Sequence, residues 1–174
     1  MKRIAIINRG VPGSGKSTFT KTMTELANSE GLSISVHSTD DKHMVDGVYK
    51  WDMKLVGRYH KENFDEFNQS LLNDIDIVIC DNTNIKHKDF NKYLSAAREQ
   101  NYTVIAVTFA PDDIQKHFER NTHNVPMDTI EQMAKRLSRN LFTDIFDREI
   151  IIYPDKFSKS KIDNVVNSIM ARVI

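Results

Sequence analysis

The stretch GVPGSGKST, residues 10–18, follows the apolar run IAII at residues 4–7 and decides the fold. It matches the pattern G-x-x-x-x-G-K-[ST] at its four fixed positions, which are Gly10, Gly15, Lys16 and Ser17. Glycines let backbone N–H groups converge on phosphate oxygens, and a helix that begins at the loop adds the partial positive charge of its N-terminus. The sequence therefore predicts a strand, a phosphate-binding loop and a helix in succession.

The loop also predicts its ligands. We expect six consecutive residues to bind the nucleotide, namely Gly13, Ser14, Gly15, Lys16, Ser17 and Thr18. Lys16 is expected to reach the β- and γ-phosphates, and the Ser17 hydroxyl is expected to coordinate Mg²⁺. The predicted cofactors are therefore ATP and Mg²⁺, and no residue pattern in the chain identifies the base.

Apolar runs alternate with amphipathic segments along the rest of the chain. Strands are expected at residues 4–7, 33–37, 76–80, 102–109 and 149–153. Helices are expected at about residues 16–30, 52–73, 87–100 and 112–121, then after the segment NTHNVP and at the C-terminus, with residues 41–50 as a loop. Continuous apolar strands that alternate with helices indicate an α/β fold, with a parallel sheet of about five strands and helices on both faces.

Length and composition set limits on the class of protein. A chain of 174 residues suits one domain, predicted here to span residues 1–174. With 24 basic and 24 acidic residues, the net charge of zero argues against a protein that coats long nucleic acid. The one cysteine, Cys80, allows no internal disulfide, and no apolar run is long enough for a membrane span. We therefore expect a cytoplasmic protein without membrane contact.

The third strand ends in DIVIC and is followed by DNTN, residues 81–84. A carboxylate at this strand end lies beside the phosphate loop, so Asp81 is expected to support Mg²⁺, although turn chemistry also favours Asp there. The next residue is Asn82, where a motor-type ATPase commonly has a glutamate that activates water. A GTP switch is disfavoured because NKYL, residues 91–94, lacks the required aspartate. We therefore expect the γ-phosphate to pass to a substrate hydroxyl, which needs a nearby base.

The sequence STDD, residues 38–41, follows the second strand and offers two carboxylates for that role. Ligands of open parallel sheets bind outside the carboxyl ends of the strands, which are the same end as the phosphate loop. Asp40 is the expected base. Asp41 is expected to serve as a turn or helix-cap carboxylate instead.

Several motifs together resemble the polynucleotide 5′-kinase family of P-loop kinases. They are GVPGSGKST, STDDKHMVDGVYKWD, RYHKEN, CDNTNI and RNTHNVPMDTIEQM, and they follow the family order from residue 4 to about residue 137. The phosphate loop is generic, whereas STDD, DNTN and RN…VP at these intervals are more specific. The resemblance implies a P-loop kinase domain with a short lid at about residues 120–137, and transfer of the ATP γ-phosphate to the 5′-hydroxyl of DNA or RNA.

The resemblance also implies roles for individual residues. By position, Asp40 matches the general base, and Asp81 matches the strand-end aspartate near the metal, the phosphates and the acceptor side. Arg120 matches an arginine of the lid region that contacts the nucleotide. With Lys16 and Mg²⁺, Arg120 is expected to neutralise charge on the transferring group, which makes both residues catalytic candidates.

Two departures from the family concern the acceptor side and the lid. His43 stands where the bacteriophage enzyme has an arginine, three residues beyond its catalytic aspartate. The lid segment 121–126 is shorter than in that enzyme and lacks its second arginine, for which His123 is the nearest substitute. Both departures affect the identity of the acceptor more than the kinase chemistry.

Four further side chains have two interpretations each. His43 is either a phosphate or acceptor contact or a solvated loop histidine. His60 lies near the apolar stripe of its helix, which favours a buried core histidine, although an acceptor-side role stays open. Tyr49 and Trp51 are candidates for stacking on a base, and packing is the alternative.

Three functions remain open at this point. The first choice is an ATP- and Mg²⁺-dependent kinase that acts on the 5′-hydroxyl of a polynucleotide, with Asp40 as base. One alternative is a kinase of a small hydroxyl substrate, such as a nucleoside or sugar nucleotide. The other is a nucleotide-binding regulatory ATPase that transfers phosphate to no acceptor. The sequence predicts neither the oligomeric state nor a preference between DNA and RNA.

Overall fold

The computed structural model describes residues 2–153 and 159–173. Its main sheet has five strands in the order β2-β5-β1-β6-β7. Their bounds are Ile4–Arg9 for β1, Ile34–His37 for β2, Ile77–Cys80 for β5, Thr103–Phe109 for β6 and Arg148–Ile152 for β7. All neighbouring pairs are parallel, and Ile4 in the central strand aligns with Ile77 on one side and Thr103 on the other. The predicted α/β fold with a five-stranded parallel sheet is confirmed.

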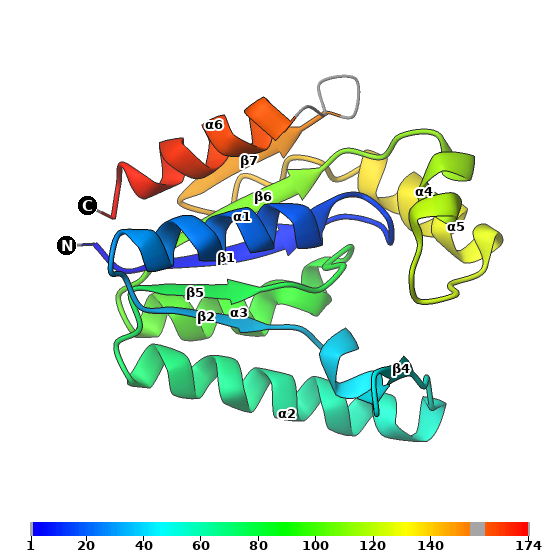
Figure 1. Cartoon of the computed structure of the whole chain (residues 1–174), viewed down its shortest axis with the longest axis horizontal. Helices are drawn as coiled ribbons and strands as arrows, with labels where there is room; N and C mark the ends of the chain where they lie inside the picture. Colours follow the sequence, from blue (N-terminus) through cyan, green and yellow to red (C-terminus); the bar gives the residue numbers. More distant parts are fainter. Residues whose placement is uncertain (1, 154–158, 174) are drawn as a thin grey trace.

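Helices cover both faces of the sheet (Figure 1). Helices α1 (Lys16–Ser29) and α6 (Lys159–Met170) pack on one face, and α2 (Met53–Leu72) and α3 (His87–Glu99) pack on the other. Successive side chains of a strand point to opposite faces. Ile4 and Ile6 of β1 therefore join the core beneath α1 and α6, while Ala5 and Ile7 join the core beneath α2 and α3. This two-sided burial explains why the inner strands β1, β5 and β6 are largely apolar runs.

A turn and a small hairpin occupy residues that the sequence predicts to be a loop. A 3₁₀ turn, η1 (Asp40–His43), leads into the antiparallel strands β3 (Met44–Val45) and β4 (Val48–Tyr49). Asp46 and Gly47 connect the strands with φ angles of 53° and 76°, the left-handed conformation that a two-residue hairpin turn requires. The expectation of a loop over residues 41–50 was therefore wrong, because Asp46 and Gly47 close a hairpin between two very short strands.

The remaining two helices lie at the carboxyl ends of the strands, opposite the hairpin (Figure 1). They are α4 (Ile114–Arg120) and α5 (Met127–Ser138). A separate apolar cluster joins α5 to the phosphate loop and to the segment after β5, through Val11, Ile85, Ile130, Ala134 and Leu137. The segment predicted as a lid is therefore packed on the phosphate loop. No helix in the described part of the chain is long and apolar enough to cross a membrane.

Candidate functional site

The phosphate loop runs from β1 into α1, and its conformation depends on glycine. Gly13 and Gly15 have φ angles of 70° and 98°, which side chains with a Cβ rarely adopt. The Lys16 ammonium donates hydrogen bonds to the carbonyl oxygens of Gly10 at 3.1 Å and Val11 at 3.0 Å. Ser14 Oγ is buried and has no hydrogen-bond partner among the described residues, so a phosphate oxygen would satisfy it. The loop thus has the conformation and donors of a phosphate site.

Asp81 is held firmly at the base of this loop. Its Oδ1 accepts a hydrogen bond from Asn8 Nδ2 at 3.0 Å, and its Oδ2 accepts one from the Thr20 hydroxyl at 2.9 Å. Asn8 Nδ2 also donates to Thr20 Oγ1 at 2.9 Å, which closes a triangle of polar side chains. Carboxylate and hydroxyl oxygens suit Mg²⁺, which binds through one or two carboxylates and several waters. Asp81 and the exposed hydroxyl of Ser17 are therefore suitable donors for Mg²⁺.

The asparagines after Asp81 have structural partners. Asn82 Oδ1 accepts a hydrogen bond from the Thr39 backbone N–H at 2.9 Å, which ties the end of β5 to the STDD turn. Asn84, with a φ angle of 47°, donates to the Asn8 carbonyl oxygen at 2.7 Å. Asn82 therefore shapes the acceptor side of the site, and it has no carboxylate with which to activate water.

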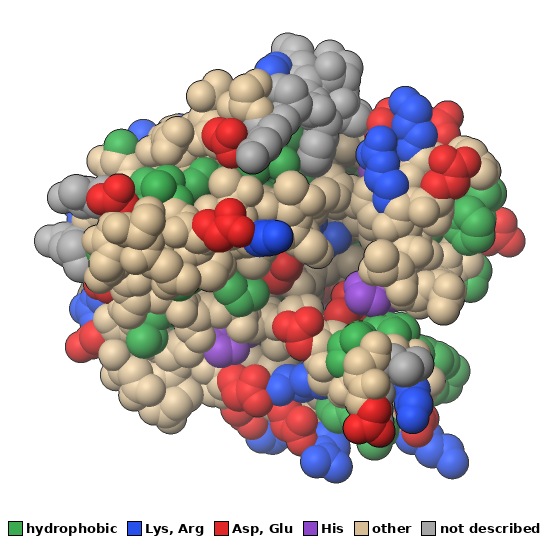
Figure 2. Space-filling view, viewed as in Figure 1, with side chains coloured by type: hydrophobic (Ala, Val, Ile, Leu, Met, Phe, Trp, Pro, Cys, Tyr) green, Lys and Arg blue, Asp and Glu red, His purple; other side chains and the backbone are tan. Residues whose placement is uncertain are grey.

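Asp40 opens the turn η1 and lies across the site from the phosphate loop. Its Oδ2 is 3.7 Å from Nε2 of His123, and its side chain is 44% exposed. The ring of Tyr49 lies between the hairpin and the predicted lid, 4.6 Å from the His123 ring. Burial, followed by the charge of Asp40, raises the pKa of Tyr49 to about 12. Asp40 thus lies where the hairpin and residues 121–126 meet, and Figure 2 shows a hollow on this face with acidic side chains and a histidine beside it.

Charges couple Asp40 to the phosphate side. Burial lowers the pKa of Lys16, while the negative charges of Asp81 and then Asp40 act in the opposite direction. Asp41 is exposed to solvent, yet partial burial and the charges of Asp81 and Asp40 raise its pKa. Three carboxylates and the lysine therefore share one electrostatic environment, as expected for a site that binds Mg²⁺ and phosphate. The individual roles of Asp40 and Asp41 stay predictions.

Of the two candidate histidines of the acceptor side, His43 is buried and His60 is exposed. His43 is 3% exposed, its ring is 4.8 Å from that of Tyr59, and its Nδ1 lies 3.3 Å from the Lys50 carbonyl oxygen. It is therefore no solvated loop histidine. His60 is exposed, with Nδ1 3.3 Å from Thr39 Oγ1, so the expectation of a core histidine was wrong. The fully buried residues of α2 begin only at Asn63, because the first turns of the helix extend beyond the sheet.

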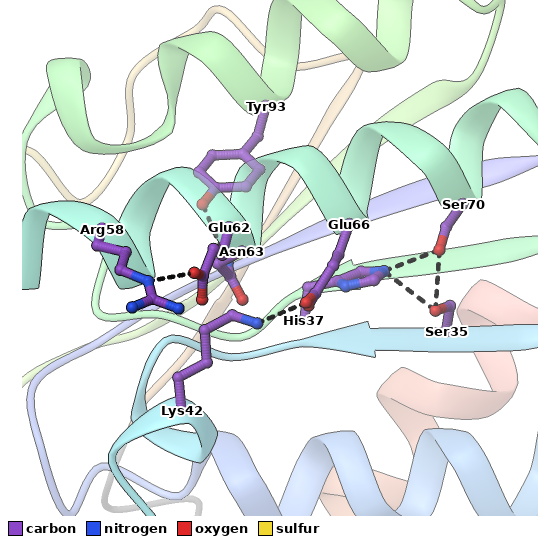
Figure 3. Close-up of polar contacts among 9 residues, drawn as sticks. All are labelled: Ser35, His37, Lys42, Arg58, Glu62, Asn63, Glu66, Ser70 and Tyr93. Atoms are coloured by element: carbon purple, nitrogen blue, oxygen red, sulfur yellow. Dashed lines mark hydrogen bonds and ion pairs between the residues drawn. The ribbon is translucent and has the colours of Figure 1, made fainter. Parts of the chain in front are cut away.

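Helix α2 holds the STDD turn from the outside (Figure 3). Lys42 Nζ donates to Glu66 Oε1 at 2.7 Å. Nε2 of His37, in β2, lies 3.0 Å from two hydroxyl oxygens. One belongs to Ser35 of the same strand, and the other belongs to Ser70, one turn after Glu66 on α2. These contacts join β2 and η1 to one helix and so fix the direction in which the chain leaves β2.

Helix α4 brings Arg120 to the other side of the loop. An ideal Cβ built on Gly13 would lie 3.2 Å from Cβ of Arg120 and 2.3 Å from the backbone oxygen of His117. The helix therefore touches the loop backbone, and Arg120 projects from that contact with an exposed side chain. The sequence reasoning found Arg120 through the resemblance but missed His117, for which neither spacing nor a motif gave a signal.

Arg9, directly before the loop, was also missed. Its side chain is fully buried and donates to the backbone oxygens of Asn84 at 3.3 Å, Asn140 at 2.8 Å and Leu141 at 3.2 Å. Burial lowers its pKa, with Glu149 acting in the opposite direction. Arg9 thereby joins the loop to the segment after α5. A charged residue at the end of the apolar run IAIIN was the signal that could have identified it.

Comparisons with known proteins agree with this fold. Human NEDD4-binding protein 2 is 29% identical over 142 residues, which are 78% of this chain but only 8% of that protein's length. The crystal structure of Chaetomium thermophilum Kti12 in complex with ADP-AlF3 is similar with a TM-score of 0.66 and 14% identity, over 98% of this chain and 99% of the other. A chain of the Pnkp1/Rnl/Hen1 RNA repair complex is similar with a TM-score of 0.63 and 18% identity, over 82% of this chain and 47% of the other.

These likenesses confirm a P-loop kinase-like fold, and they do not confirm the narrower polynucleotide 5′-kinase family. The family described as chromatin associated protein KTI12 matches residues 5–173. That description does not confirm the cytoplasmic location expected from the sequence. Because the match spans nearly the whole chain, the protein belongs to the KTI12 family.

Proposed function

We propose that this chain binds ATP with Mg²⁺ and cleaves the γ-phosphate as a nucleotide-dependent regulatory ATPase. Membership in the KTI12 family and the likeness to a Kti12 that was solved with ADP-AlF3 support the proposal. The observation that carries it is the phosphate site itself, where the Ser14 hydroxyl is buried without a partner and Asp81 is held by Asn8 and Thr20. Asn82, in the place of a hydrolytic glutamate, is bound to Thr39, so Asp40 is the carboxylate assigned to the attacking oxygen.

Each residue then has a defined task. Lys16 exchanges the carbonyl oxygens of Gly10 and Val11 for the β- and γ-phosphates, and Arg120 approaches from α4. Ser17 and Asp81 would hold Mg²⁺, which would supply positive charge to the phosphate oxygens. Asp40 accepts the proton of the attacking oxygen as that oxygen bonds to the γ-phosphorus and the bond from the γ-phosphorus to the β–γ bridging oxygen breaks. The leaving ADP keeps the electron pair of that bond.

A second candidate function is transfer to a hydroxyl, above all the 5′-hydroxyl of a polynucleotide. It is favoured by the 44% exposure of the Asp40 side chain, which leaves the carboxylate open to a substrate, and by the STDD and DNTN motifs. Trp51, two residues after Tyr49 in the chain, is 58% exposed and is therefore open to stacking on a base. A small hydroxyl substrate would meet the same base, and acceptor assays separate the two.

The test uses ATP labelled at the γ-phosphate. Wild type, Asp40→Asn and Lys16→Ala are incubated with Mg²⁺ alone, with 5′-hydroxyl DNA or RNA oligonucleotides, and with nucleosides or sugar nucleotides. Release of labelled phosphate without labelled acceptor supports the regulatory ATPase, whereas label on an oligonucleotide supports the kinase.

Asp40→Asn should lower the rate by about 10²- to 10⁴-fold, the contribution of a positioned base, while the ATP dissociation constant changes little. Lys16→Ala should weaken ATP binding itself. Normal turnover of Asp40→Asn would refute the assignment of the base, and wild type that neither binds nor cleaves ATP would refute the proposed function.

A further inference from the structure

The ring of His117, on helix α4, joins the phosphate loop to the segment that precedes the helix, with one ring nitrogen on each side. The backbone N–H of Asp112 donates a hydrogen bond to Nε2 at 2.8 Å, and Nδ1 lies 3.2 Å from the Gly13 carbonyl oxygen. A backbone N–H can only donate and a carbonyl oxygen can only accept. Nε2 must therefore carry the lone pair and Nδ1 the hydrogen, so the contacts assign His117 to one neutral tautomer.

The surroundings of His117 keep the ring neutral. The residue is 2% exposed, and burial lowers its pKa. The Gly13 carbonyl and the Asp112 charge act in the opposite direction, while the positive charges of Arg120 and Lys16 lower the pKa further. Protonation would also place a hydrogen on Nε2, directly against the Asp112 N–H.

The hydrogen bond to Gly13 determines how the loop faces the helix. In a trans peptide the C=O and the following N–H point in opposite directions. Because the Gly13 oxygen points to His117, the Ser14 N–H points away from α4, and it bonds to the Val11 oxygen at 3.2 Å. Val11 is one of the two loop residues whose carbonyl oxygens hold Lys16. His117 therefore fixes a peptide that shapes the interior of the loop.

The same contact sets the position of Arg120, which lies one turn after His117 on α4. Helix and loop backbone touch so closely that a Cβ on Gly13 would come within 2.3 Å of the His117 oxygen. Any rotation of α4 that broke the His117–Gly13 bond would therefore also displace Arg120 from the loop.

We propose that His117 is a positioning residue that holds the phosphate loop and Arg120 at the spacing which the γ-phosphate requires. It acts through the Gly13 carbonyl and one turn of helix. The inference rests on the proposed ATP cleavage, in which Lys16 and Arg120 contact the phosphates. It adds a residue to that site which neither the loop motif nor the resemblance includes.

Three substitutions separate the two hydrogen bonds of the ring. In His117→Asn the side-chain amide is placed like Nδ1 and keeps a donor for Gly13, whereas His117→Gln is placed like Nε2 and keeps an acceptor for Asp112. His117→Phe keeps neither. We expect the Asn variant to retain a KM for ATP near the wild-type value, and the Gln and Phe variants to show an increase of about tenfold, the effect of one buried hydrogen bond.

Two controls distinguish positioning from a general loss of stability. Tyr102→Phe removes a buried hydroxyl that bonds to the Ile75 oxygen at 2.7 Å, at the end of the sheet far from the loop. It should lower stability without a change in KM. The double variant of His117→Phe with Arg120→Ala should lose less than the sum of the two single losses, because part of the effect of His117 passes through Arg120.

An experiment without nucleotide keeps this inference separate from the proposed function. The ¹⁵N chemical shifts of the imidazole ring report directly which nitrogen carries the hydrogen. The hydrogen on Nδ1 of His117 at pH 7 is expected, and a hydrogen on Nε2 would overturn the inference even if ATP is cleaved. Equal KM increases in the Asn and Phe variants would overturn it too. The expected tautomer in a protein that does not bind ATP would refute the proposed function, and with it the positioning role that rests on it.

Discussion

Replacing Gly13 with alanine tests the contact between the phosphate loop and α4, and Gly31→Ala is its matched control. Both glycines have left-handed backbones, with φ angles of 70° and 72°. An added Cβ on Gly31 meets nothing within 4 Å, whereas on Gly13 it lies 2.3 Å from the His117 backbone oxygen. The two variants therefore share the strain of a left-handed alanine and differ only in the clash.

The expected losses of stability follow from the left-handed strain and from the clash. The left-handed conformation costs an alanine about 1–2 kcal/mol, so Gly31→Ala should lower the free energy of unfolding by about that amount. In Gly13→Ala the contact must lengthen from 2.3 Å to at least 3.0 Å, so α4 and the loop must separate. Loss of the His117–Gly13 hydrogen bond and nearby packing should add about 1–2 kcal/mol, for a total of roughly 2–4 kcal/mol.

Equilibrium unfolding in urea measures the stability of both variants, and calorimetric titration measures their affinity for ATP. Gly13→Ala should weaken ATP binding by about tenfold or more, because the loop amides no longer converge, while Gly31→Ala should bind ATP like wild type. Equal losses of stability in the two variants, within about 0.5 kcal/mol, would refute the close approach of α4 to the loop. Normal ATP binding by Gly13→Ala would refute the link between this contact and the phosphate site.

Three further predictions concern the rest of the site. Thr20→Val removes the hydroxyl that joins Asn8 to Asp81, so the free energy of unfolding should fall by about 1–2 kcal/mol. The Mg²⁺ concentration needed for half-maximal ATP cleavage should rise several-fold, and an unchanged Mg²⁺ requirement would contradict the role of Asp81. Burial lowers the pKa of His37 to about 4, below its unfolded value of 6.5, so the unfolded chain takes up the proton first as the pH falls. The contribution of His37 to stability is full above about pH 6.5 and should fall by roughly 3 kcal/mol by pH 4. Urea unfolding of His37→Gln should therefore show a smaller loss of stability over this pH range. Trp51 is 58% exposed, so Trp51→Ala should change the free energy of unfolding by less than about 0.5 kcal/mol, and a large loss would show that Trp51 is a packing residue. If the chain is a polynucleotide kinase, the same variant should raise the KM for the oligonucleotide.

The sequence predicted the parallel sheet because its signals are local and strong. Each buried strand is a continuous apolar run, and the loop motif marks the end of β1 and the start of α1 within one or two residues. The hairpin was missed although Asp46 and Gly47 are a known turn pair, because its strands have only two residues each and little apolar pattern.

The supports of the site could not be predicted in the same way. Thr20 and Asn8 contact Asp81 across 61 and 73 residues of sequence, and His117 contacts Gly13 across 104. All three are common polar residues without a distinctive spacing. Only the fold brings them to Asp81 and to the phosphate loop. A sequence pattern therefore identifies the groups that bind ligands more readily than the neutral groups that hold them in place.

The two sides of the site also differ in how tightly they are built, and this difference bears on the choice between hydrolysis and transfer. Asp81 is fixed through both carboxylate oxygens, whereas the Asp40 side chain is 44% exposed, lies 3.7 Å from His123 and interacts with the hydroxyl of Tyr49. Hydrolysis and transfer both need the phosphate loop, Mg²⁺ and Arg120. The Asp81 side of the site therefore cannot distinguish water from a substrate hydroxyl. On the proposed mechanism, the attacking oxygen is therefore selected by what lies against the exposed side of Asp40, beside Tyr49 and His123. Substitutions at Tyr49 and His123 should accordingly change the ratio of phosphate release to phosphate transfer while the affinity for ATP stays constant.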